Sequence, residues 1–260
     1  MLELKNFAVS LAHEAGALLI EKFDQSIEIH YKGDINLVTE ADKMSENIIM
    51  AAIRQSFPEH GILSEESPAI LDGSSLRWII DPLDGTTNYA HGYPVFCVSI
   101  ALEKNGTIIL GVIYDPTRRD TFVAVRGEGA FLNGKKLAVS KVSALSRSLL
   151  ATGFPYDIRE SEENNLNYFN IMAKEVQAIR RAGAAALDIA YAAAGRFDGF
   201  WELKLKPWDT AAACLLLEEA GGKITDIFGG PWNLLSPNLL ASNSLLHEQM
   251  IAVFKRTADG

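Results

Sequence analysis

The chain has 260 residues, of which 48% are hydrophobic and 22% are charged, so it can bury a sizeable core and is not a disordered polypeptide. Its 24 basic and 33 acidic residues give a net charge of −9, which argues against nucleic-acid binding through a broad basic surface. The two cysteines, Cys97 and Cys214, lie in apolar runs and are expected to be buried free thiols. The sequence has no signal-peptide pattern and no apolar run of membrane-spanning length, which predicts a cytoplasmic protein without membrane attachment.

The first half of the chain, about residues 1–150, is predicted to begin with two helices and to continue as strands. Apolar residues at helical spacing predict an amphipathic helix over Leu2–Phe23 and a second helix over Thr39–Phe57, which Pro58 ends. The polar segment Asp24–Asn36 between them is expected to form a loop or a loose hairpin. Apolar runs bounded by turn residues, including a hairpin signal at Asn133, predict short strands over Gly61–Ser64, Leu76–Asp81, Val95–Glu103, Ile108–Tyr114 and Thr121–Arg126.

In the second half, about residues 151–260, longer helices alternate with short strands. Helices are predicted over Glu162–Lys174, Gly183–Gly195, Pro207–Ala220 and Ser244–Lys255. Strands are predicted over Arg196–Leu203 and Leu239–Ala241. Because no linker separates the halves, we expect a single domain, 1–260, of the α/β (α+β) class, with mixed sheets that helices cover.

The turn after the strand that ends at Asp81 carries the strongest chemical signal. Pro82 is expected to end this strand, because proline cannot donate to the ladder of a sheet. Two carboxylates, one free carbonyl and the start of a helix follow one another within seven residues: Asp81, Leu83, Asp84, Gly85, Thr86 and Thr87. Carboxylate and carbonyl oxygens suit Mg²⁺, and amides at a helix N-terminus suit a phosphate. The turn therefore indicates metal-assisted hydrolysis of a phosphate ester.

Three further acidic residues each allow two interpretations. Asp42 could close a capping box with Thr39, or it could orient a hydroxyl or a water molecule. Glu65 follows a short apolar run and could be an exposed loop residue, or it could bind a metal or the attacking water. Asp209 lies in the first turn of a helix, where it would stabilise the helix dipole. Trp208 and the apolar helix around Asp209 could also bury its carboxylate, and a cation would then balance the charge.

Several motifs in a fixed order resemble the inositol monophosphatase family. The segments that carry the resemblance are Thr39–Asp42, Glu65–Ser67, Trp78–Tyr89, Gly183–Tyr191, Gly195–Gly199 and Trp208–Gly222. Together they cover nearly the whole chain, and they favour the functional interpretations of the three acids above. The resemblance implies a layered α-β-α-β-α sandwich of the sugar phosphatase type and Mg²⁺ as the cofactor.

The resemblance also assigns roles to individual residues. The implied Mg²⁺ ligands are Glu65, Asp81, Asp84, Asp209 and the carbonyl of Leu83. Glu65 and Thr86 would hold the attacking water, and Asp42 would polarise Thr86. Phosphate and substrate contacts are implied for Gly85, Thr86, Thr87, Gly183, Ala184, Ala185, Glu202 and Asp209. Lys32 matches a basic residue on a loop near a weaker metal.

The substrate is less well defined than the chemistry. Many members of the family carry Ser or Thr where this chain has Ala184, so one hydroxyl contact to the substrate is missing. We expect a phosphatase of inositol monophosphate or of a related sugar or polyol phosphate. Alternatives are fructose bisphosphate, histidinol phosphate, a nucleotide 3′-phosphate, or a regulatory binding role on the same fold. The resemblance further implies inhibition by lithium and a homodimer.

Overall fold

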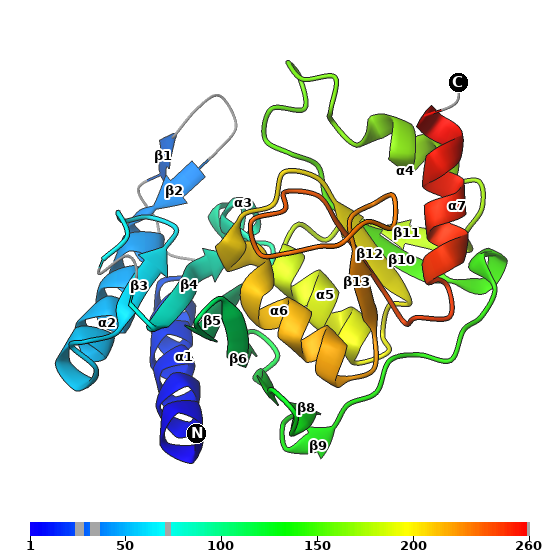
Figure 1. The fold of residues 1–260 in the computed structure, drawn as a ribbon. Helices are drawn as coiled ribbons and strands as arrows, with labels where there is room; N and C mark the ends of the chain where they lie inside the picture. The colour runs from blue at the N-terminus through cyan, green and yellow to red at the C-terminus, as the bar shows by residue number, and fades with distance from the viewer. Residues whose placement is uncertain (24–28, 32–36, 71–73, 259–260) are drawn as a thin grey trace.

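The computed structural model describes residues 1–23, 29–31, 37–70 and 74–258, which form five layers of helices and sheets (Figure 1). From left to right in Figure 1, the layers are a helix pair, a sheet, a second helix pair, a second sheet and a last helix pair. The expected mixed α/β class and its layered arrangement are confirmed. Among the described residues, no helix is long and apolar enough to span a bilayer.

A seven-stranded sheet in the order β3-β4-β5-β6-β7-β8-β9 forms the second layer. Its strands are β3 (Gly61–Ser64), β4 (Leu76–Asp84), β5 (Cys97–Lys104), β6 (Thr107–Asp115), β7 (Asp120–Val125), β8 (Gly129–Leu132) and β9 (Lys135–Lys136). Only β3 and β4 are parallel. Helices α1 (Leu2–Lys22) and α2 (Glu40–Ser56) cover one face, where Trp78 and Ile80 of β4 are buried. Ile79 points to the opposite face, as the alternation along a strand requires.

Helices α5 (Ala185–Ala193) and α6 (Pro207–Glu219) form the central layer between the two sheets. Both helices are rich in alanine and buried, so they can approach the neighbouring strands closely. One close approach is between Gly111 of β6 and Ala212 of α6, where a Cβ on Gly111 would lie 2.7 Å from the Ala212 carbonyl oxygen. Only glycine therefore fits at this crossing of strand and helix.

The fourth layer is a five-stranded sheet in the order β11-β10-β12-β14-β13. Its strands are β10 (Leu149–Thr152), β11 (Ala178–Arg180), β12 (Gly199–Glu202), β13 (Lys223–Thr225) and β14 (Leu239–Ser242). Helices α4 (Leu166–Met172) and α7 (His247–Ala258) form the outer layer. The remaining elements are short: the hairpin β1 (Ile29–Tyr31) and β2 (Leu37–Thr39), the helix α3 (Thr86–Ala90) and a 3₁₀ turn (Leu145–Arg147).

Most predicted elements of the first half are confirmed, and the predicted free thiols of Cys97 and Cys214 are both buried. The predicted end of a strand at Asp81 is wrong, because β4 continues to Asp84. The sequence analysis also missed short strands, including β10, β11 and β13, which are only three or four residues long. Helix α4 is shorter than predicted, beginning at Leu166. The single-domain division 1–260 stays a prediction.

Candidate active site

A cavity of about 490 Å³ lies where the end of β4 faces the N-termini of α5 and α6. It brings together residues from both halves of the sequence. The predicted site residues that line it are Glu65, Asp81, Leu83, Asp84, Gly85, Thr86, Thr87, Gly183, Ala184, Ala185, Glu202 and Asp209. Asp42 lies just behind the wall, and Lys32 lies outside the described residues.

The end of β4 is irregular, and this irregularity turns its acidic residues into the cavity. The register of β4 against β5 shifts between Asp81 and Asp84, so the strand passes Pro82 through a bulge. The Ser45 hydroxyl of α2 donates to the Pro82 carbonyl at 2.8 Å, and the Leu83 amide donates to Asp81 Oδ1 at 3.0 Å. A proline can sit within this strand because the bulge needs no ladder bond from it.

Gly85 makes the sharp turn from β4 into α3. Its φ is +96°, in the left-handed region that residues with a side chain avoid. A Cβ at this position would also lie 2.8 Å from the Val95 carbonyl oxygen. The turn leaves Thr86 and Thr87 in the first turn of α3, with Thr86 buried against α2.

Asp42 fulfils both of the roles that the sequence left open. Its Oδ2 accepts hydrogen bonds from the Thr39 amide (2.8 Å) and the Thr39 hydroxyl (2.5 Å), which completes the capping box of α2. Its Oδ1 accepts a bond from the Thr86 hydroxyl at 2.9 Å. Because the two oxygens face different partners, one carboxylate caps a helix and orients a cavity hydroxyl at the same time.

Glu46, one turn after Asp42, was not found by the sequence analysis. Its buried carboxylate accepts bonds from the Glu66 amide at 3.1 Å and the Ser67 hydroxyl at 2.6 Å, and so fixes the loop that carries Glu65. Three side chains of α2 thus hold three segments of the site: Asp42 holds the start of α3, Ser45 holds the bulge of β4 and Glu46 holds the loop after β3. The only signal in the sequence that could have identified Glu46 is its spacing of four residues from Asp42, which places both side chains on the same face of the helix.

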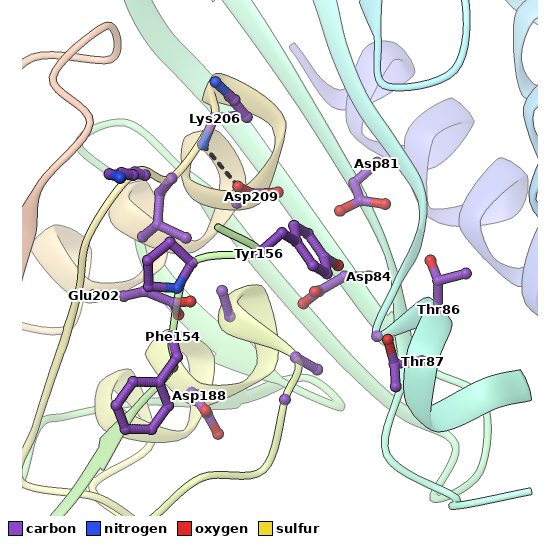
Figure 2. A pocket seen from close by; sticks show the side chains of 18 of the residues that line it. Asp81, Asp84, Thr86, Thr87, Phe154, Tyr156, Asp188, Glu202, Lys206 and Asp209 are labelled. Carbon is purple, nitrogen blue, oxygen red and sulfur yellow. Dashed lines mark hydrogen bonds between the residues drawn. The ribbon is translucent and has the colours of Figure 1, made fainter. Parts of the chain in front are cut away.

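Asp84 and Asp209 are anchored from opposite sides of the cavity. The Ala186 amide, in the first turn of α5, donates to Asp84 Oδ2 at 2.8 Å. The Lys206 amide, before α6, donates to Asp209 Oδ2 at 2.7 Å (Figure 2). Asp209 therefore occupies the capping position that the helix-dipole interpretation expects, and it also lines the cavity.

The acidic residues raise one another's pKa. Burial raises the pKa of Asp81 well above its usual range, and the charges of Glu65, Asp84 and Asp209 raise it further. Burial also raises the pKa of Asp84 and of Asp209 to about 7, against the amide bonds that lower it. Clustered carboxylates disfavour one another's ionised form, and a bound cation would reverse this effect.

The donor set fits a hard divalent cation, because it consists of carboxylate oxygens and one backbone carbonyl. Within the described ranges, no three His, Cys, Asp or Glu side chains are already gathered at coordinating distance. Coordination would therefore require small side-chain movements of carboxylates that share the cavity. The fold already brings these carboxylates to one cavity, where Asp81 and Asp84 face Asp209 (Figure 2).

Several cavity residues were missed or given no role by the sequence analysis. Tyr156 lies between Asp209 and Asp84 in Figure 2, and Phe154 and Asp188 lie on the side away from Asp81. Phe154 and Tyr156 belong to an irregular segment after β10, where no periodicity marks a position as facing the site. Asp188 belongs to a motif that the sequence analysis recognised, but its position in the motif carried no separate signal.

Comparisons with known proteins agree with this geometry. The family model described as "Inositol monophosphatase family" matches residues 1–258. The chain is 43% identical over 251 residues to "Nus factor SuhB" of Escherichia coli, covering 95% of this chain and 94% of that protein. It is 41% identical over 256 residues to "Inositol-1-monophosphatase" of Mesorhizobium japonicum, covering 97% and 96%. Among solved structures, inositol monophosphatase from Anabaena has a TM-score of 0.90 at 43% identity, covering 98% and 96% of the two chains.

Proposed function

Because the chain belongs to the inositol monophosphatase family and is therefore a phosphomonoester hydrolase, we propose that it uses Mg²⁺ to hydrolyse inositol monophosphate or a related polyol phosphate. The observation that supports the metal is the cluster of Asp81, Asp84 and Asp209 beside Glu65, in which burial and the neighbouring negative charges raise the pKa of the three aspartates. Such a cluster at the end of a strand is stabilised by a divalent cation.

We assign the cation to Glu65, Asp81, Asp84, Asp209 and the Leu83 carbonyl. When bound, Mg²⁺ would supply positive charge to the phosphate oxygens and lower the pKa of the attacking water. The amides of Gly85, Thr86 and Thr87, at the start of α3, would donate to the phosphate, because first-turn amides have no carbonyl partner within their own helix. Protein groups thus orient the phosphate, and the chain needs no side chain as a nucleophile.

The attacking water is assigned to Glu65 and Thr86. The Thr86 hydroxyl has one proton, and its two acceptors are Asp42 Oδ1 at 2.9 Å and the Leu83 carbonyl at 3.1 Å. Its oxygen is therefore an acceptor that can take a hydrogen bond from the water and aim a lone pair of that water at phosphorus. Glu65 lies on the loop that Glu46 fixes, and its carboxylate would accept the second water proton.

The alcohol part of the substrate is assigned to the end of the cavity formed by Glu202 and by Gly183, Ala184 and Ala185. Glu202 supports a polyol, because a carboxyl group can bond neighbouring hydroxyls. Fructose bisphosphate, histidinol phosphate and a nucleotide 3′-phosphate are the alternative substrates. Inhibition by lithium, a homodimer and a cytoplasmic location belong to the same proposal; light scattering would measure the oligomeric state.

A substrate panel tests the proposed function. Phosphate release should be highest with inositol monophosphate and lower with fructose bisphosphate, histidinol phosphate and phosphoadenosine phosphate. It should disappear with a chelator, return with Mg²⁺ and fall in a lithium titration. Turnover of another panel member as the clear favourite would replace the polyol assignment, and turnover that survives the chelator would remove the metal.

The double role of Asp42 allows its two bonds to be tested separately. Thr86→Val removes the hydroxyl that is assigned to the water and should lower kcat by about a hundredfold, as for the loss of a positioned proton-transfer partner. Thr39→Ala removes the helix cap and should cost about 1 kcal/mol of stability, with a much smaller change in kcat. Steady-state kinetics and thermal unfolding of both variants are the measurements. Equal kcat losses in the two variants would contradict the assignment of Thr86.

The name of the Escherichia coli relative suggests a second candidate function, an association with transcription factors. This role would be separate from catalysis. A variant without activity, such as Asp84→Asn, would keep such an association. Co-purification of purified RNA polymerase with both the wild type and this variant would support the role, and binding of neither would remove it.

A further inference from the structure

Asp188 is a buried carboxyl group that the reaction proposed above does not use. It lies in α5, one turn after Ala184 and Ala185, and only 2% of it is exposed. Its Oδ1 has no hydrogen-bond partner among the described residues. A buried polar atom without a partner costs free energy, so its presence needs a reason.

The position of Asp188 suggests that reason. Asp188 lines the cavity together with Phe154 and Glu202, on the side away from Asp81 (Figure 2). The phosphate end and the Asp188 end are thus at opposite sides of one cavity. A substrate whose phosphate lies at the N-terminus of α3 would place its alcohol part toward Asp188 and Glu202.

Glu202 and Asp188 both line the cavity, and the backbone of each lies in a well-packed element. Glu202 ends β12, and Gly153 packs so closely against its carboxyl that any Cβ on Gly153 would overlap the Glu202 oxygens. Asp188 is held by α5, where its amide donates to the Ala184 carbonyl at 3.0 Å. Each carboxyl is therefore presented from a rigid element, as a subsite with defined geometry requires.

The charge state of the pair favours a hydroxyl over an ammonium group. Burial raises the pKa of Glu202 to about 8, and the charge of Asp209 raises it while that of Arg181 lowers it. Burial raises the pKa of Asp188 well above its usual range, and the Glu202 charge adds to this effect. A raised pKa weakens the negative charge that would attract an ammonium group, whereas a hydroxyl can both donate to and accept from carboxyl groups.

We propose that Asp188 is a specificity-determining residue that, together with Glu202, hydrogen-bonds the hydroxyl groups of the alcohol part of the substrate. This inference rests on the proposed function and deepens it. Asp188 contacts neither the phosphate nor the attacking water. Its effect is therefore on which phosphate ester is accepted, and a rotation of its carboxyl group would let the unsatisfied oxygen meet a substrate hydroxyl.

The test compares two substrates that share the phosphate and differ in the alcohol. For Asp188→Asn, the ratio of kcat/KM for inositol monophosphate to kcat/KM for p-nitrophenyl phosphate should fall about tenfold, as expected for one lost hydrogen bond to a buried group. Free myo-inositol should also inhibit p-nitrophenyl phosphate hydrolysis about tenfold more weakly than in the wild type. If Asp188→Asn fails to fold, Asp188→Ser takes its place, with the same expected changes.

Asp198→Asn is the matched control. Asp198 is also buried and lies in the same region of the sequence, but it has partners outside the cavity: the Ser140 hydroxyl at 2.5 Å and the Leu149 amide at 2.7 Å. This variant should lose thermal stability and keep the wild-type substrate ratio. A substrate ratio and a myo-inositol inhibition that are both unchanged in Asp188→Asn would overturn the inference.

Hydrolysis by the wild-type enzyme tests the proposed function separately from the role of Asp188. Hydrolysis of both esters with unchanged selectivity in Asp188→Asn would sink the role of Asp188 and leave the proposed function intact. Hydrolysis of p-nitrophenyl phosphate alone would overturn the polyol substrate and the role of Asp188 together. A clear preference for histidinol phosphate that depends on Asp188 would show that the pair takes an ammonium group, which also contradicts the inference.

Discussion

Asp84→Asn will abolish phosphomonoester hydrolysis while the chain remains folded. The substitution keeps the shape of the side chain and removes the charge of a central carboxylate of the cluster, so the affinity for Mg²⁺ should fall sharply. Loss of metal-based charge stabilisation is worth several kcal/mol, so kcat/KM should fall by about a thousandfold or more. Kinetics at increasing Mg²⁺ concentration, together with circular dichroism, provide the measurement.

Asp115→Asn is the matched control for this prediction. Asp115 is also buried, at the end of β6, but it accepts a hydrogen bond from Arg118 at 2.9 Å and lies outside the cavity. Its replacement should reduce stability and leave the dependence of activity on Mg²⁺ as in the wild type. Wild-type turnover in Asp84→Asn would show that the metal assignment is wrong, whatever the control does.

Mg²⁺ will stabilise the protein strongly at alkaline pH and weakly at acidic pH. The pKa of Asp84 and of Asp209 is about 7 in the folded protein, against a usual value of 3.8. A carboxyl with a raised pKa stabilises the folded state below the unfolded pKa, and this contribution is lost as the pH rises toward the folded pKa. In metal-free protein, the free energy of unfolding should therefore fall between about pH 4 and pH 7, by on the order of 4 kcal/mol for a single such carboxyl.

The measurement is thermal unfolding with chelator and with saturating Mg²⁺ at about pH 5 and about pH 8. Mg²⁺ binds the ionised carboxylates, so the rise in Tm should be larger at the higher pH. Asp84→Asn should lose most of this rise, and NaCl at the same ionic strength should not reproduce it. An equal rise in Tm at both pH values would mean that the metal does not bind through these carboxyls.

The turn from Asp81 to Thr87 could be interpreted from sequence because its chemistry is local. Asp81, Leu83 and Asp84 follow one another in the chain, so no tertiary information was needed to place them together. The same locality misled the prediction at Pro82. A bulge that Ser45 of α2 supports lets the strand continue to Asp84, and a bond between a helix and a strand 37 residues later is not visible in a local pattern.

Residues that act through tertiary contacts were beyond a local interpretation. Asp42 was assigned to Thr86 only through the family resemblance, and the capping box was equally consistent with the sequence. Glu46 and Asp188 had no signal of their own, since each gains its importance from a partner, or from the lack of one, that only the fold defines. Tyr156 lies in an irregular segment, where periodicity cannot show which side chains line the cavity.

The close crossing of Gly111 and Ala212 has a consequence for the tolerance of this protein to substitution. Asp209 lies three residues before Ala212 on α6, whereas Asp81 and Asp84 lie on the sheet that contains Gly111. The gap between these carboxylates is therefore set by a spacer outside the cavity, the single hydrogen atom that is the side chain of Gly111. A methyl group added at Gly111 would push α6 away from the sheet. The distance from Asp209 to Asp81 and Asp84 would then increase, although no metal ligand had changed.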